Sequence, residues 1–103
     1  MKSAIWKYTL PTVPGAFTLE MVPCGATILS VQMQNRVPCM WCRFEFEDYR
    51  PRMELRKFRM VKTGALIQET DACHLKYIGT LQINSSYVLI DSSYVLHLFE
   101  EVS

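Results

Sequence analysis

Cysteine and histidine are the residues of this sequence with which metal binding or nucleophilic chemistry would begin. Cys39 and Cys42 have the C-x-x-C spacing of zinc knuckles and dithiol redox sites, and Cys24, Cys73 and His74 could complete a ligand set. The surrounding residues alternate between apolar and polar types, however, and residues three apart on a strand point to opposite faces. We therefore predict no metal site and interpret the cysteines as free, mostly buried thiols in a reducing compartment.

A thiol enzyme would also need a base that lowers the pKa of its nucleophile. His74 directly follows Cys73, but adjacent strand residues diverge, and His97 lies in the apolar run 95–99 as a hydrogen-bonded histidine would. No glycine-rich phosphate loop or serine nucleophile elbow is found. We predict a protein that is not an enzyme, with no catalytic residue and no cofactor.

Basic side chains are concentrated between positions 43 and 62, where seven of the 11 lysines and arginines occur. Guanidinium groups bind phosphate and aromatic rings stack on bases, so this region is a candidate ligand site. A solvated, charged strand and loop is the alternative interpretation. The predicted ligand-binding residues are Arg50, Arg52, Arg56, Arg59, Tyr49 and Trp41.

Length and composition place the chain among small globular proteins. Its 103 residues suit a single domain over residues 1–103, and 50% hydrophobic residues suffice for one core. A net charge of +1 makes a nucleic acid polymer an improbable partner. With neither a secretory signal nor a long apolar segment in this sequence, we expect a cytoplasmic protein without a membrane partner.

Short segments rich in β-branched and aromatic residues alternate with prolines, glycines and asparagines, which is typical of an all-β domain. We predict a mostly antiparallel fold, either a small β-sandwich or a partly open barrel of about 6–8 short strands, with at most one short helix. The expected strands are Ala4–Leu10, Phe17–Met21, Ile28–Gln34, Val37–Glu47, Leu55–Val61, Leu75–Ile83 and Val88–Phe99.

Alternation within these strands predicts which side chains face the core. Phe58 is expected to point inward, whereas Ile28 is assigned to the polar face of its strand and Leu29 to the apolar face. Asn35–Arg36 has the length of a two-residue hairpin loop. Gly79 predicts a bulge or a close approach of another backbone.

The pentapeptide SSYVL occurs twice near the C-terminal end, beginning at Ser85 and again at Ser92. The odd spacing of seven would place the two tyrosines on opposite faces of one straight strand, so we favour a small hairpin with its turn at 91–93. An added strand would offer a new edge for a homo-oligomer, and a tolerated surface insertion is the alternative. The predicted oligomer interface is Tyr87, Tyr94, Leu96 and Leu98.

Four segments of the sequence, IWKY from Ile5, GATILSVQ from Gly25, PCMW from Pro38 and YIGT from Tyr77, carry a resemblance that covers nearly the whole chain. The chain resembles a family of short, functionally uncharacterised proteins of phages, prophages and bacteria. It departs from that pattern at the seven-residue repeat and at Cys42. The resemblance implies an accessory protein of a virus or prophage in a bacterial host, and anti-defence activity by association.

Three functions follow as hypotheses. The first is a non-enzymatic binding protein, a homo-oligomer, that sequesters a host protein or a small phosphorylated ligand through the region 43–62. The second is a structural or assembly protein of a phage particle that uses its C-terminal strands. The third, a zinc- or thiol-dependent protein, has the weakest support.

Overall fold

Seven strands form the secondary structure of the described residues, which in this computed structural model are 1–47, 50–68, 70, 74–83 and 94–102. Each strand matches a segment expected from the sequence, although the ends differ by a few residues and the start of the last expected strand lies outside the described residues. The strands are β1 (Lys2–Thr9), β2 (Gly15–Pro23), β3 (Thr27–Gln34), β4 (Val37–Phe46), β5 (Met53–Lys62), β6 (Leu75–Ile83) and β7 (Tyr94–Glu101).

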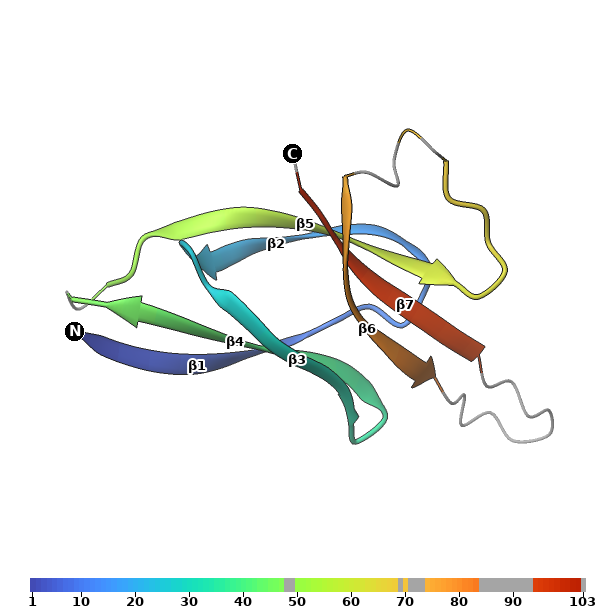
Figure 1. Cartoon of the computed structure of the whole chain (residues 1–103). Coiled ribbons are helices and arrows are strands. Elements are labelled where there is room, and N and C mark those ends of the chain that lie inside the picture. The colour runs from blue at the N-terminus through green and yellow to red at the C-terminus, as the bar shows by residue number, and fades with distance from the viewer. Residues whose placement is uncertain (48–49, 69, 71–73, 84–93, 103) are drawn as a thin grey trace.

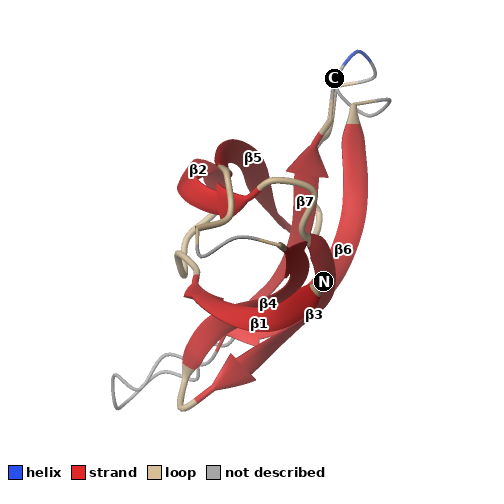
Figure 2. Cartoon of the chain, turned by 90° about the vertical axis from the view of Figure 1, so that its left-hand side faces the viewer, coloured by secondary structure: helices blue, strands red, loops and turns tan. Residues whose placement is uncertain are grey.

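The strands make two antiparallel sheets, one of three strands in the order β1-β4-β3 and one of four in the order β2-β5-β7-β6 (Figure 1). Figure 2 shows β1 and β4 lying across the interior from β2 and β5. The two sheets are not hydrogen-bonded into a closed barrel. The predicted all-β class is confirmed, and of the two predicted architectures the sandwich is the one observed.

The core lies between the sheets and is built from alternate residues of the central strands. Met40 and Cys42 of β4 and Phe58 and Met60 of β5 have exposed fractions of 1% or less. Burial of one such large apolar side chain contributes roughly 1.5–3 kcal/mol. The inward direction predicted for Phe58 is therefore confirmed.

The connection between β3 and β4 is a two-residue hairpin turn, as its length predicted. Asn35 has φ of 49° and Arg36 has φ of 66°. Positive φ at both central residues is the requirement of a type I′ turn, whose twist matches that of the flanking strands. Asparagine tolerates this conformation, whereas arginine occupies it at some cost.

A bulge in β3 overturns the predicted directions of two neighbouring residues. Ile28 is opposite Cys42 and Ser30 is opposite Trp41, so Leu29 is the extra residue on its strand. Ile28 consequently packs against the core, while Leu29 points outward with 48% of its surface exposed. Strict alternation assigned them the other way round because a bulge reverses the facing of every residue that precedes it.

The bulge predicted at Gly79 is confirmed, whereas the close approach there is made by a side chain and not by another backbone. The register between β6 and β7 shifts between Tyr77 and Gly79. A Cβ at position 79 would overlap the Cγ1 methyl of Val31 on β3. Glycine is therefore the residue that lets the edges of the two sheets touch.

Candidate functional site

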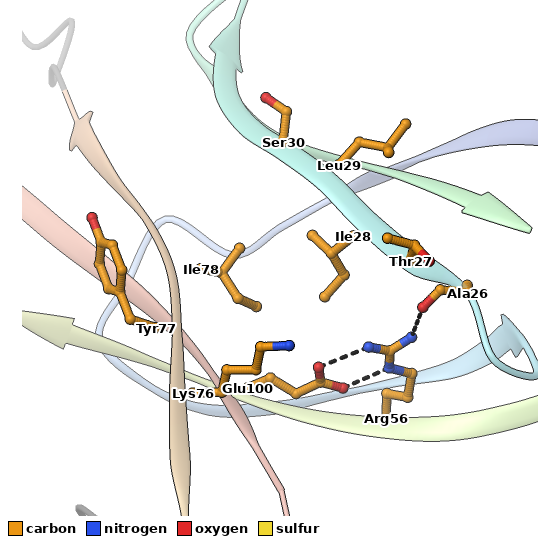
Figure 3. Close-up of a pocket in the computed structure, with 10 residues that line it drawn as sticks. All are labelled: Ala26, Thr27, Ile28, Leu29, Ser30, Arg56, Lys76, Tyr77, Ile78 and Glu100. Carbon is orange, nitrogen blue, oxygen red and sulfur yellow. Dashed lines mark hydrogen bonds and ion pairs between the residues drawn. The ribbon is translucent and has the colours of Figure 1, made fainter.

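A cleft of about 310 Å³ lies where the edge strands β3 and β6 separate. Figure 3 shows its two walls, with Ala26 to Ser30 on one side and Lys76 to Ile78 on the other. This volume is at the lower end of the range for pockets that hold small molecules, roughly 300–1,000 Å³. The cleft therefore suits a compact group rather than a large ligand.

The floor of the cleft is an ion pair between β5 and β7. Arg56 Nε donates to Glu100 Oε2 at 2.5 Å and Arg56 Nη2 donates to Glu100 Oε1 at 2.7 Å. Arg56 Nη1 donates to the carbonyl of Ala26 at 2.6 Å, which anchors the start of β3. These side-chain hydrogen bonds to Glu100 raise the pKa of the Arg56 guanidinium. A planar guanidinium that grips a carboxylate through two bonds fixes the geometry of this floor.

Two further ionisable groups lie beside the pair. Burial raises the pKa of the Cys42 thiol, an effect that Arg56 opposes and Glu100 reinforces. Burial also raises the pKa of the Tyr8 phenol, whose hydroxyl donates to the carbonyl of Met21 at 2.9 Å. Both groups therefore stay protonated at neutral pH, where Cys42 lacks the thiolate character of a nucleophile.

The rim of the cleft combines one exposed cation with apolar surface. Lys76 stands on β6, and Figure 3 shows its amine extending over the cleft floor. Ile28 and Ile78 face each other from the two walls, and the hydroxyl groups of Thr27 and Ser30 belong to the same wall as Ile28. The lining residues thus carry one net positive charge, because the charges of the floor pair cancel.

Both walls are interrupted by bulges at the cleft. The bulge of β3 lies at Leu29 and that of β6 lies at Ile78. Bulges are common beside binding sites, where they redirect side chains and end strand pairing. The cleft is therefore bounded by two irregular edges that do not join into a continuous sheet.

Comparison with known proteins identifies the family. A family model described as a domain of unknown function, DUF7352, matches residues 1–103. The chain belongs to this family. No curated protein and no solved structure matches it. The predicted membership of a functionally uncharacterised family is confirmed.

The arginines predicted to form one ligand site do not converge in the DUF7352 domain. Arg56 points into the cleft floor, whereas Arg59 lies on the opposite face of β5 and binds Glu101 Oε1 at 2.5 Å. Arg50 and Arg52 are exposed in the connection that precedes β5.

Of the two aromatic residues assigned to that site, Trp41 is described and does not lie beside the arginines of β5. Trp41 belongs to the other sheet, where it is paired with Lys7 and Ser30 on the face turned away from the core. Tyr49 lies outside the described residues.

Three of the residues predicted for an oligomer interface are described, and each of them contacts the rest of the same chain. Leu96 and Leu98 are fully buried between the sheets, so their side chains are not available to a partner. Tyr94 is partly buried and its hydroxyl donates to the carbonyl of Thr12. Tyr87 and most of the repeated segment lie outside the described residues.

Three of the cysteines and both histidines are among the described residues, and Cys73 lies outside them. Cys39 and Cys42 are buried in the regular strand β4, and Cys24 is exposed. His97 is hydrogen-bonded as expected, with Nε2 at 2.7 Å from Thr63 Oγ1 and Nδ1 at 3.0 Å from Thr80 Oγ1.

Within the described ranges there is no group of three or more histidine, cysteine or acidic residues placed to hold a metal ion. In the same ranges, no helix has both the length and the apolar character needed to span a membrane.

The cleft itself was missed by sequence reasoning. Its floor unites Arg56 with Glu100, which is 44 residues away. The spacing along β7 offered one signal. Positions 96, 98 and 100 are each two residues apart, so the side chain of Glu100 lies on the same face as the buried Leu96 and Leu98. A carboxylate on a core face requires a partner, and an arginine on the core face of another strand could have been sought.

Proposed function

We propose that this domain is a non-enzymatic binding protein whose cleft receives a carboxylate group presented by a protein partner. The observation that carries the proposal is the arrangement of Lys76 above a neutralised Arg56–Glu100 pair, between the aliphatic side chains of Ile28 and Ile78. A carboxylate with a short apolar neighbour matches this surface in charge and size. Acidic side chains and chain termini of proteins both have that chemistry.

The same geometry argues against a phosphorylated ligand. Phosphate sites gather several donors around one dianion. Here Arg56 already donates to Glu100 and to the carbonyl of Ala26, and the carboxylate of Glu100 would repel a second anion brought to the floor. Only Lys76 on the rim then remains to bind the ligand. Its single positive charge matches the single negative charge of a carboxylate.

The cellular role follows from the sequence resemblance to short proteins of phages and prophages. We infer an accessory, anti-defence role in the cytoplasm of a bacterial host, where the domain would sequester a host protein. The half-open cleft supports recognition of one protruding group, and the surrounding surface would supply the remaining contacts.

Nuclear magnetic resonance titration with small probes tests the cleft. N-acetyl-leucine carries a carboxylate beside an aliphatic side chain. N-acetyl-leucinamide has an uncharged amide in place of the carboxylate, and inorganic phosphate represents the alternative ligand. We expect the carboxylate to shift the amide resonances of Thr27 and Ile78, and the amide and phosphate to leave them unchanged.

Matched variants test whether Lys76 supplies the positive charge that binds the carboxylate. Lys76→Gln is expected to abolish the response to N-acetyl-leucine, whereas Lys57→Gln, an exposed lysine of β5, retains it. Equal responses to the carboxylate and the amide, or a stronger response to phosphate, would overturn the proposal.

A further inference from the structure

The four edge strands of the described sheets differ in regularity. Register shifts interrupt the pairing of β2, β3 and β6 with their neighbours. By contrast, β1 pairs with β4 without a shift over all eight of its residues, from Lys2 to Thr9. Bulges are a common protection of sheet edges against pairing with another chain, so β1 is the edge that lacks this protection.

We propose that β1 is a homodimer interface, at which it pairs antiparallel with β1 of a second copy and joins the two three-stranded sheets into one of six strands. A regular edge presents outward-directed backbone N–H and C=O groups along its whole length. A strand of eight residues is about 27 Å long, enough for several such hydrogen bonds. Backbone pairing of this kind is a common mode of strand addition.

The geometry of antiparallel pairing restricts the register. Only alternate residues of β1 direct their backbone groups to the free edge, because the others bond to β4. When two β1 strands pair, residues that stand opposite each other come from the same alternate set. Their residue numbers are then both odd or both even, so the sum of the two numbers is even. Lys2 can therefore never stand opposite Lys7, whose sum is odd, and the two lysines of this edge do not oppose each other.

One even register matches the side chains best. With a sum of ten, Ile5 stands opposite Ile5 of the second copy on the outer face, and Trp6 stands opposite Ala4. Ile5 is 58% exposed and Trp6 38%, so this pairing covers the two most exposed large apolar side chains of the strand. A large residue beside a small one packs without overlap, and Ser3 is left opposite Lys7.

The size of the contact sets its strength. Pairing of single edge strands lies at the lower end of specific interfaces, below about 1,200 Å². We therefore expect a dimer that forms reversibly with rising concentration. This interface also differs from the one predicted at the C-terminal strands, where Leu96 and Leu98 are buried in the core.

Sedimentation velocity over a wide range of concentrations tests the interface. The mass is expected to rise from 12.0 kDa toward twice that value. Ile5→Lys introduces charge repulsion at the two-fold axis and should keep the chain monomeric. Leu29→Lys, which places the same charge at a similarly exposed leucine on the bulged edge β3, should dimerise like the wild type. A constant monomer mass, or equal effects of both substitutions in chains with unchanged circular dichroism, would overturn the inference.

Cysteine cross-linking tests the register in a Cys24→Ser/Cys73→Ser background. Ile5→Cys should form a disulfide-linked dimer on mild oxidation, because directly opposite Cβ atoms are about 4.5–5.5 Å apart. Ser3→Cys should not, since its counterpart lies four residues along the strand, about 13 Å away. Cross-linking at Ser3→Cys in place of Ile5→Cys would exclude this register.

Discussion

Two arginine–glutamate pairs join β5 to β7, one on each face of the same sheet. The inner pair, Arg56–Glu100, has side chains that are 16% and 10% exposed, whereas those of the outer pair, Arg59–Glu101, are 31% and 26% exposed. Their shortest distances are both 2.5 Å. The two pairs have the same residue types and the same distance but should contribute differently to stability. The inner pair has lost most of its water, and the outer pair has not.

Breaking the inner pair should have the largest effect. Glu100→Leu leaves the Arg56 guanidinium uncompensated between the sheets, and removal of one member of a buried pair costs about 3–5 kcal/mol. The double variant Arg56→Met/Glu100→Leu should regain most of that stability. Urea denaturation of the three proteins measures the difference, and a double variant no more stable than Glu100→Leu would contradict the assigned role of the pair.

Alkaline pH should have the second-largest effect on stability, through deprotonation of the Cys42 thiol beside the inner pair. Because the folded-state pKa of Cys42 is raised, the native state holds its proton more tightly than the unfolded state does, and stability falls as the pH rises past the ordinary thiol value of 9.0. The slope contributed by one proton reaches at most about 1.4 kcal/mol per pH unit. Unfolding free energies of Cys42→Ala should show a shallower decline. Because burial also raises the pKa of Tyr8, the free energy of unfolding should keep falling at still higher pH in both proteins.

Breaking the outer pair should have the smallest effect. Glu101→Gln removes an ion pair that stays accessible to water and salt, and such pairs contribute about 1 kcal/mol or less. The loss should shrink further as salt is added, while the loss caused by Glu100→Leu should persist. Denaturation of both variants at low and high salt compares the two, and equal sensitivity to salt would remove the distinction between the faces.

The sequence predicted the class of the fold and the positions of its strands because alternation and turn residues are local signals. Met40 and Phe58 follow strict alternation, and the loop at Asn35 was recognisable from its length alone. The facing of Ile28 and Leu29 could not be predicted, since a bulge depends on the register with a partner strand that is distant in the sequence.

The candidate site was harder to predict for the same reason. The cluster of arginines along the chain suggested one binding surface, but successive positions on a strand and its flanking loop point in different directions. Arg56 and Arg59 are three residues apart and therefore lie on opposite faces. Their partners come from β7, so only the pairing of β5 with β7 reveals which arginine belongs to the cleft.

The contact of Gly79 with Val31 has a mechanical consequence. It holds β6 against β3 at the residue that follows Ile78, which lines the cleft. Since these two strands belong to different sheets and share no backbone ladder, their edges meet here through a side chain alone. Any side chain at position 79 would have to displace Val31 or push the two edges apart, so the separation of the cleft walls depends on the absence of a Cβ at this glycine.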